Sequence, residues 1–180
     1  MTARRISEID WDSWHPVDPA TLVFVIQDGR ILLIRKKRGL GAGKINGPGG
    51  RLEPGETPEG CAARELHEEL GVTAGPLVRA GDHRFQFVDG YSIFVHVYWT
   101  SVFSGTPVET DEAVPMWFEV GAIPFDEMWE DDRYWLPLVL EGRPFSGYWI
   151  FDGDRMIDHR LDLGPESHFT NHEDAPLGVR

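Results

Sequence analysis

The chain has 180 residues and a formal net charge of −13, from 17 Lys and Arg residues against 30 Asp and Glu residues. Hydrophobic residues make up 41% and charged residues 26% of it, which is typical of a globular domain and excludes a disordered, collagen-like or disulfide-stapled chain. At about 150 residues per domain, one domain is expected. The acidic balance argues against a nucleic-acid polymer or an anionic membrane as partner, because both carry negative charge.

The cysteine count and the first residues of the chain indicate the cellular compartment. Cys61 is the single cysteine, so a disulfide within the chain and a cysteine-rich zinc site are both excluded. Residues 1–8 carry two arginines with no apolar run behind them, unlike a signal peptide. The longest stretch without charged side chains, residues 91–108, alternates like a strand and does not read as a membrane span. We expect a cytoplasmic protein; the oligomeric state is left open, with a monomer favoured.

The chain divides into three parts by composition. Residues 1–20 are polar and aromatic and form an N-terminal extension that is expected to wrap the surface. Residues 21–163 carry the apolar periodic runs and form the domain. Residues 164–180 are polar and are expected to be a loose tail.

The first elements of the domain are a hairpin and a loop. Apolar β-branched runs at 21–26 and 31–34 flank Asp28-Gly29, a pair typical of a hairpin turn. Seven residues between 39 and 50 are glycine or proline, which predicts a loop, or strand ends with close backbone approaches. Later strands are expected at 83–88, 93–103, 116–120, 147–151 and 156–161, with a second helix within 131–141. Pro137 falls in that helix and is tolerable only near its start.

A first helix is expected between Thr57 and Gly71. Threonine is a favoured N-cap, Pro58 suits the first helical position and Gly71 is a typical stop. Apolar residues at four-residue spacing form a stripe that we expect to be buried: Ala62, Leu66 and Leu70. The order of strands and helices predicts a mixed α/β sandwich.

The same helix carries more carboxylates than a solvated helix needs. Glu65, Glu68 and Glu69 share one face by their spacing, and we expect that face to lie opposite the apolar stripe. Arg64 can bridge Glu68 or reach back to Glu56, but one arginine cannot neutralise four carboxylates. A divalent hard cation such as Mg²⁺ can, because it prefers carboxylate oxygens. The alternative is a solvated acidic face.

This stretch matches the Nudix signature G-x5-E-x7-R-E-U-x-E-E-x-G-U, with U aliphatic, at every fixed position. The matching residues are Gly50, Glu56, Arg64, Glu65, Leu66, Glu68, Glu69, Gly71 and Val72. Average residue usage gives such a match a chance on the order of 10⁻⁸ per starting position. The chain therefore resembles the Nudix family. That resemblance implies an α/β/α sandwich with a mixed sheet, in which a loop-helix-loop binds Mg²⁺ and hydrolyses a nucleoside diphosphate linked to another moiety.

The resemblance extends beyond the signature, over about residues 21–161, to the MutT-type Nudix hydrolases of mammals. It is carried by segments that include residues 35–43, Asn46-Gly47, Asp111-Glu112, Met128-Trp129 and Asp131-Asp132. It implies hydrolysis of oxidised purine nucleoside triphosphates such as 8-oxo-dGTP or 2-hydroxy-dATP to monophosphate and pyrophosphate, with Mg²⁺ or, as a substitute, Mn²⁺. The chain departs from these relatives where it lacks their aromatic residues, at Ala20, Leu40, Ile45 and Pro48. The preferred base is therefore left open.

Two other functions remain as alternatives. One is hydrolysis of a different nucleoside diphosphate derivative, such as ADP-ribose or a dinucleoside polyphosphate. The other is a non-catalytic Nudix ligand sensor, which ranks last because such modules usually lose signature glutamates and this chain keeps them all.

The resemblance also implies roles for single residues. The expected metal ligands are Glu65, Glu68, Glu69, Glu112 and the backbone carbonyl of Gly49. Arg64 is expected to hold the carboxylates in place as part of the catalytic group. For Glu112, a solvated loop residue is an equal alternative.

Further residues are implied to bind the substrate. Lys36 is expected to contact phosphate, with a solvated strand end as the alternative. Trp129 is expected to stack on a purine, and Asn46, Asp131 and Asp132 to bind the purine edge. Thr21 is also expected to bind the substrate. Adjacent carboxylates rarely both ionise, so one aspartate is expected to keep a proton. The alternative is an acidic helix start with Trp129 in the core.

Overall fold

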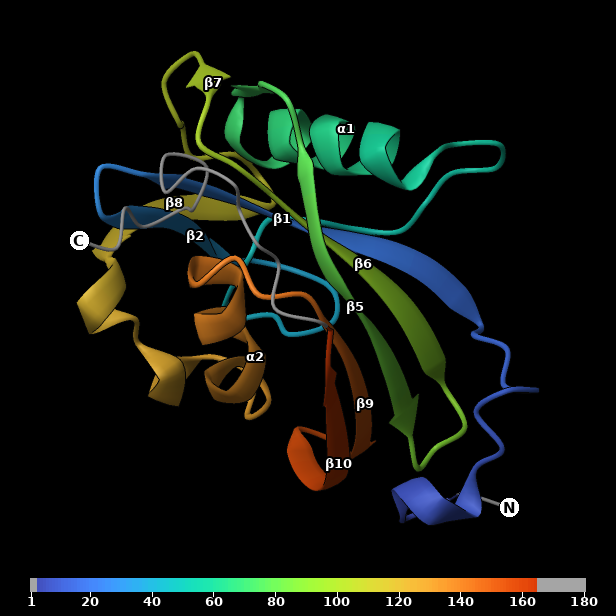
Figure 1. Cartoon of the computed structure of the whole chain (residues 1–180). Coiled ribbons are helices and arrows are strands. Elements are labelled where there is room, and N and C mark those ends of the chain that lie inside the picture. The colour runs from blue at the N-terminus through green and yellow to red at the C-terminus, as the bar shows by residue number, and fades with distance from the viewer. Residues whose placement is uncertain (1–2, 165–180) are drawn as a thin grey trace.

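The computed structural model describes residues 3–164 and, within them, one mixed eight-stranded sheet (Figure 1). Its strands are β1 (Asp18–Gln27), β2 (Arg30–Lys36), β3 (Ile45–Asn46), β5 (Val78–Phe87), β6 (Ser92–Thr100), β8 (Ala113–Glu119), β9 (Phe145–Asp152) and β10 (Arg155–Leu163). They run in the order β10-β9-β5-β6-β1-β2-β3, with β8 also paired to β2. β1 pairs with β6, and β5 with β9, in parallel; the other pairs of this sheet are antiparallel. β4 (Thr73–Ala74) and β7 (Phe103–Ser104) form a separate small ladder.

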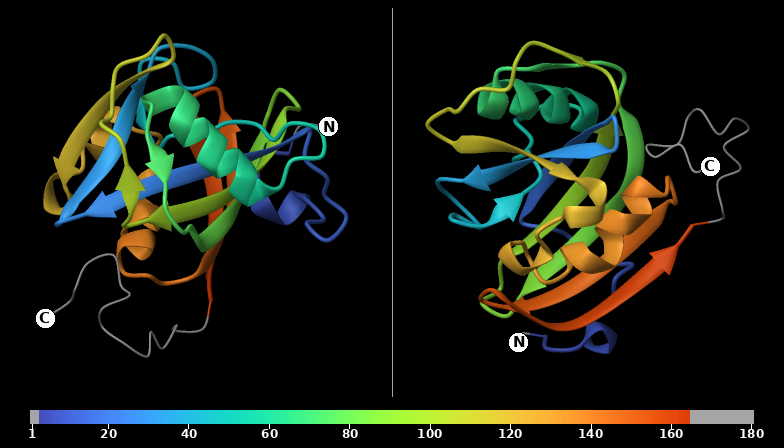
Figure 2. Two further views of the ribbon diagram at one scale, coloured as in Figure 1. Left: turned by 90° about the horizontal axis from the view of Figure 1, so that it is seen from above. Right: turned by 90° about the vertical axis from the view of Figure 1, so that its left-hand side faces the viewer.

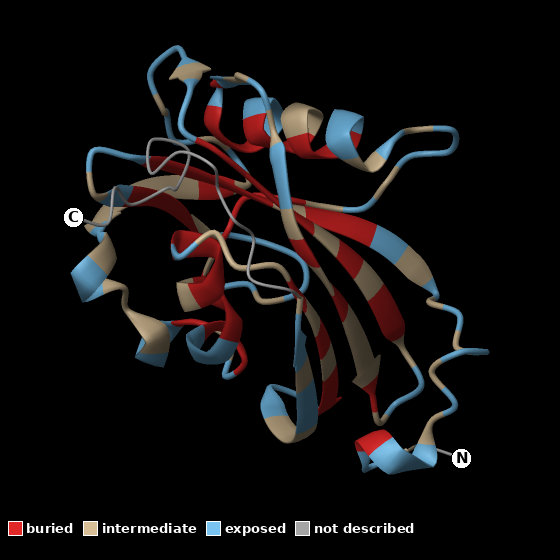
Figure 3. Cartoon of the chain, in the orientation of Figure 1, coloured by how far each residue is buried: buried red, intermediate tan, exposed pale blue. Residues whose placement is uncertain are grey.

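Two α-helices cover opposite faces of the sheet, α1 (Pro58–Leu70) and α2 (Asp132–Leu140) (Figures 1 and 2). Side chains alternate along β1, so Val23 and Val25 pack in the cluster that holds α1, while Phe24 and Ile26 pack in the cluster that holds α2. Figure 3 shows buried residues along the sheet and on the inward sides of both helices. The expected α/β/α sandwich is confirmed.

The local signals in the sequence predict the first hairpin and the first helix correctly. Asp28 and Gly29 both have positive φ, of 53° and 72°, and join β1 to β2 as a two-residue turn. Thr57 caps α1, because its Oγ1 accepts the N–H of Gly60 at 3.1 Å. Gly71 ends the helix in the left-handed conformation, with φ 71°.

The expectation for Pro137 is wrong. Proline was expected only near a helix start, yet Pro137 lies in the second half of α2. It cannot donate the helical hydrogen bond of its turn, but its carbonyl still accepts the N–H of Glu141 at 3.0 Å. Burial of Leu136, Leu138 and Val139 in the core outweighs the cost in this short helix.

The N-terminal segment crosses the sheet surface and does not line the cavity described below. The indole N–H of Trp14 donates to Gln86 Oε1 at 3.0 Å, and the ring of Trp11 meets Tyr148 edge-on at 5.0 Å. Gln86 and Tyr148 alternate with residues that face α2, so this segment covers the other face (Figure 2). β1 begins at Asp18, earlier than the boundary expected at residue 21.

Two further points concern the ends of the chain and membranes. The expected loose tail falls almost wholly on residues 165–180, which lie outside the described part. No helix in residues 3–164 is both long enough and apolar enough to span a bilayer.

Candidate active site

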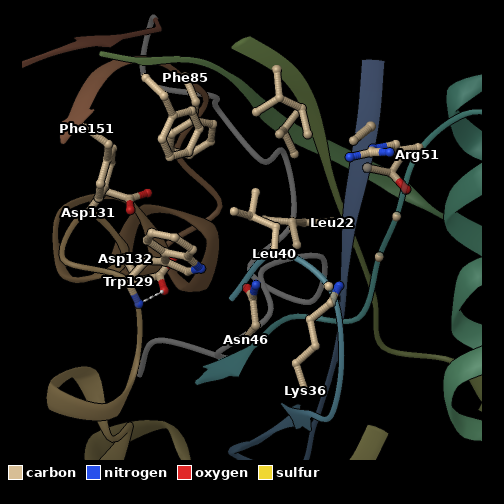
Figure 4. A pocket seen from close by; sticks show the side chains of 18 of the residues that line it. Leu22, Lys36, Leu40, Asn46, Arg51, Phe85, Trp129, Asp131, Asp132 and Phe151 are labelled. Atoms are coloured by element: carbon tan, nitrogen blue, oxygen red, sulfur yellow. Dashed lines mark hydrogen bonds between the residues drawn. The ribbon is translucent and has the colours of Figure 1, made fainter. Parts of the chain in front are cut away.

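A cavity of about 320 Å³ opens between the sheet and α2 (Figure 4). Its apolar wall comes from inward-facing residues of four strands: Ala20, Leu22, Phe85, Phe87, Ile93, Val95 and Phe151. Figure 4 shows Trp129, Asp131 and Asp132 on one side, and Lys36 and Arg51 on the side nearer α1. The cavity is therefore apolar in the middle, acidic at one side and basic at the other.

Asp131 and Asp132 are buried where α2 begins, 1% and 3% exposed. Oδ2 of Asp131 accepts the indole N–H of Trp135 at 2.8 Å, and Oδ2 of Asp132 accepts the backbone N–H of Trp129 at 3.1 Å. Burial raises the pKa of Asp131 to about 7 and raises the pKa of Asp132 well above its usual range, with Asp131 adding to the latter. Burial thus outweighs the helix N-terminus, which favours the charged forms.

Trp129 lies on the cavity wall, where it is half-buried and packs against the core cluster that holds α2. Its ring meets Phe151 edge-on at 5.4 Å, and the ammonium of Lys44 lies 5.1 Å from the ring centre. Gly41 leaves room for the indole, since a Cβ at this glycine would lie 2.9 Å from its Nε1. Nearby, Asn46 lines the cavity and accepts the N–H of Gly47 at 2.8 Å.

Gly49 and Gly50, here called the glycine segment, run alongside β1 between the cavity and α1, and both are closely packed. Gly49 has φ 152°, and a Cβ there would lie 2.1 Å from the carbonyl oxygen of Thr21. A Cβ on Gly50 would lie 2.3 Å from Oε1 of Glu65. The backbone N–H of Gly49 donates to Oε2 of Glu69 at 2.8 Å. The glycine segment thus brings the backbone directly against two carboxylates of α1.

The acidic face of α1 was expected to lie opposite its apolar stripe, and this expectation is wrong. Glu65 and Glu69 are buried, at 9% and 1% exposed, and form a stripe with Cys61 beside Ala62, Leu66 and Leu70. Only Glu68 of the three points to solvent. Burial raises the pKa of Glu65, and raises that of Glu69 to about 7. The alternative of a solvated acidic face is therefore wrong for two of the three.

Arg64 holds this group of carboxylates together. Its guanidinium donates to both oxygens of Glu56, at 2.8 and 2.9 Å, and to Glu65 and Glu68, at 2.8 and 2.9 Å. Both contacts considered from the sequence, with Glu68 and with Glu56, are present. The bidentate pairing lowers the pKa of Glu56 to about 2. Arg64 fixes the helix and the preceding loop relative to each other.

The carboxylates expected to hold metal do not converge on one point. In residues 3–164, no group of three or more Asp, Glu, His or Cys side chains is placed to hold a metal ion. Arg64 occupies Glu65 and Glu68, and Arg38 pairs with Glu112. Lys36 Nζ lies 4.0 Å from Glu69 Oε1. Each of these four carboxylates thus has a basic partner.

The residues nevertheless fit a hard divalent cation. Their donors are carboxylate oxygens and a glycine backbone, the ligands such a cation prefers. The nearly buried carboxylate of Glu69 has one hydrogen bond, from Gly49, and a lysine at 4.0 Å, which leaves its charge weakly compensated.

Thr21 and Glu112 differ in how they lie relative to the cavity. Thr21 lines the cavity, but its hydroxyl turns to the α1 face and lies 3.3 Å from Cys61 Sγ. Glu112 lies on the loop before β8 and, like Glu65, Glu68 and Glu69, outside the cavity lining. Its charge contributes to the raised pKa of Glu69, so it lies near the other expected metal ligands. Sequence reasoning also missed Arg51 and Trp135, which line the cavity. The one available signal was spacing, because Trp135 follows Asp131 by four residues on a helix.

Comparison with known proteins identifies the family. The NUDIX domain model matches residues 16–139. The chain belongs to the Nudix family. Two relatives, from Danio rerio and Mus musculus, are both described as oxidized purine nucleoside triphosphate hydrolase. The first is 46% identical over 144 residues, covering 79% of this chain and 92% of its own; the second is 43% identical over 143 residues, covering 78% and 92%. The chain is a Nudix hydrolase, and such enzymes generally need a divalent metal.

Solved Nudix structures share the fold. A MutT protein from Bacillus halodurans superimposes with a TM-score of 0.75 at 22% identity, covering 83% of this chain and 100% of its own. A MutT Nudix hydrolase from Burkholderia pseudomallei gives a TM-score of 0.57 at 30% identity, covering 62% and 88%.

Proposed function

We propose that this Nudix hydrolase cleaves purine nucleoside triphosphates, including oxidised ones such as 8-oxo-dGTP or 2-hydroxy-dATP, to a monophosphate and pyrophosphate. One observation carries the proposal: the cavity has a buried acidic pair and an indole at one side, and Lys36, Arg51 and the glycine segment at the other. A purine fits the first side and a polyphosphate the second. The descriptions of the zebrafish and mouse relatives support the same substrate class.

The base would be read at the acidic side. Trp129 offers a ring face for stacking, and Asn46 offers an amide. Asp131 and Asp132 together retain a proton near neutral pH, so the pair offers one donor and one acceptor to the purine edge. The apolar wall of the cavity excludes water from this contact.

The triphosphate would pass between Lys36 and Arg51 toward α1. Lys36 neutralises phosphate charge, and Arg64 keeps Glu65 and Glu68 in position. The residues that would hold Mg²⁺ are Glu65, Glu68, Glu69 and Glu112 with the carbonyl of Gly49. When bound, the metal neutralises phosphoryl oxygens and acidifies a water. A water oxygen bonds to the β-phosphorus, the bond from that phosphorus to the α–β bridging oxygen breaks, and the water proton passes to a carboxylate.

A substrate panel tests this function. 8-oxo-dGTP, 2-hydroxy-dATP, dGTP, dATP and ADP-ribose are incubated separately with the protein, with and without Mg²⁺, and pyrophosphate, phosphate and monophosphate are measured. We expect Mg²⁺-dependent pyrophosphate release from purine triphosphates. Faster turnover of ADP-ribose would overturn the substrate class, and no turnover of any nucleotide would favour a ligand sensor. We also propose that the protein is a cytoplasmic monomer, as expected from the sequence.

A further inference from the structure

Trp135 lies directly behind the acidic side of the cavity and contacts Asp131. Its indole N–H donates to Oδ2 of Asp131 at 2.8 Å. The other oxygen, Oδ1, is buried and has no hydrogen-bond partner among residues 3–164. The two oxygens of one carboxyl group are thus in different situations: one is held by the protein, and the other is left for whatever enters the cavity.

The indole that holds Asp131 is itself immobile. Trp135 is 1% exposed, and its ring lies 4.5 Å from the ring of His83 and 5.8 Å from those of Phe24 and Phe145. A ring packed on several sides cannot turn without moving the core. The contact to Asp131 is therefore a fixed feature of the cavity.

We infer that Trp135 is a positioning residue for base recognition, which holds Oδ2 of Asp131 as an acceptor and leaves Oδ1 to contact the purine. The inference deepens the proposed function and rests on it for the identity of the ligand. An indole N–H can only donate, so the carbonyl-like oxygen of a protonated Asp131 turns toward Trp135 and the proton stays on Oδ1. Oδ2 of Asp132 also accepts a hydrogen bond, from the backbone N–H of Trp129. The purine edge thus meets one defined oxygen of Asp131.

Other ionisable groups around Asp131 do not replace this contact. Besides burial, the charge of Glu130 raises the pKa of Asp131. Asp131 in turn raises the pKa of Asp132, which the charge of Lys44 lowers. His83, behind Trp135, stays neutral because burial lowers its pKa to about 3. None of these groups donates a hydrogen bond to Asp131 within the described residues.

The chain offers a matched control for Trp135. Trp149 is also fully buried, and its indole N–H also donates one hydrogen bond, to Nδ1 of His83 at 2.9 Å. Replacing either tryptophan by phenylalanine removes one indole N–H and leaves a similar small cavity in the same layer of the core. Only Trp135→Phe frees the carboxyl group of Asp131.

The first test uses ligand-free protein and does not depend on the substrate. The carboxyl ¹³C resonance of Asp131 is followed against pH in the wild type, Trp135→Phe and Trp149→Phe. Loss of a donor to the carboxylate should raise the pKa of Asp131 in Trp135→Phe and leave it unchanged in Trp149→Phe. In the wild type, the Trp135 indole N–H resonance should titrate together with Asp131. Equal titration of Asp131 in all three proteins would overturn the inference. A wild-type Trp135 indole resonance that does not titrate with Asp131 would also overturn it, and this measurement does not require Trp135→Phe to fold.

The second test uses steady-state kinetics with 8-oxo-dGTP and 2-hydroxy-dATP. We expect Trp135→Phe to raise KM about tenfold with kcat nearly unchanged, the effect of losing one well-placed hydrogen bond. The alkaline rise in KM should move to higher pH. Trp149→Phe should keep the wild-type KM and pH profile. Equal KM values in the two variants would contradict a positioning role. Absence of turnover in the wild type would instead reject the proposed function, and the ¹³C titration would still decide the contact.

Discussion

The backbone N–H of Gly49 donates a 2.8 Å hydrogen bond to Oε2 of Glu69, which joins the glycine segment to the buried face of α1. The next residue, Gly50, packs closely against the carboxyl group of Glu65. The first glycine of the signature and the glycine before it are therefore in contact with signature glutamates in the folded protein. Their spacing in the sequence reflects a packing requirement as well as a chemical one.

This contact predicts different effects for alanine at the two glycines. In Gly50→Ala the new methyl group meets the movable end of Glu65, so the fold should survive while the carboxylate is displaced. We expect a loss of roughly a hundredfold in kcat/KM, in the range known for disturbed metal ligation. Activity and the Mg²⁺-induced rise in Tm are measured together. Wild-type values for both would show that neither activity nor metal binding depends on the present position of the Glu65 carboxylate.

Gly49→Ala serves as the contrasting variant. Its methyl group would meet the backbone carbonyl of Thr21 at 2.1 Å, and φ 152° is unsuited to alanine. Backbone cannot swing aside as a side chain can, so we expect a loss of several kcal/mol in the free energy of unfolding. Urea denaturation measures it. A stability equal to that of Gly50→Ala would contradict the close approach described here.

Glu69→Gln should separate stability from catalysis. The glutamine oxygen can still accept the N–H of Gly49, and no cavity is made, so the metal-free protein should unfold within about 1 kcal/mol of the wild type. The charge that would bind metal is lost, and kcat should fall by orders of magnitude. Urea unfolding and pyrophosphate release are compared on the same preparation. Near wild-type turnover would remove Glu69 from the proposed site.

Trp129→Ala should weaken purine binding. Base stacking on an aromatic ring is worth about 1–3 kcal/mol, so KM for purine triphosphates should rise roughly fivefold to 150-fold. Trp117→Ala is the control, since Trp117 packs in the α1 cluster away from the cavity. Initial rates with 8-oxo-dGTP measure both. An unchanged KM in Trp129→Ala would place the base elsewhere.

The raised pKa of Asp131 predicts that the free energy of unfolding depends on pH. Its folded pKa, about 7, is above its ordinary value of 3.8, so between these values the native state holds a proton that the unfolded state has lost. Stability from this group is complete below about pH 4 and declines as pH rises toward 7, by at most about 1.4 kcal/mol per pH unit.

Asp131→Asn isolates this effect, because the amide can accept from Trp135 and does not titrate. The wild type should lose stability relative to Asp131→Asn as pH rises from 5 to 7, with a constant difference above pH 8. Urea unfolding at each pH provides the measurement. A difference that stays flat across this range would mean that Asp131 is ionised in the folded protein.

The sequence alone determined the features that depend on neighbours in the chain. The turn at Asp28-Gly29 and the ends of α1 at Thr57 and Gly71 follow from local backbone preferences, which act over a few residues. The signature likewise identified the family before any contact was known, because its spacing is too specific to arise by chance.

Only the tertiary structure decided which groups are buried together. Cys61, Glu65 and Glu69 are buried on α1 because the glycine segment, which lies outside the helix, packs on them, and helical periodicity cannot reveal that contact. The same holds for Asp131, whose proton depends on burial and on Trp135, and for the N-terminal segment, which lies on the face away from the cavity. Burial and pKa are properties of contacts between distant segments, so they appear only once the chain has folded.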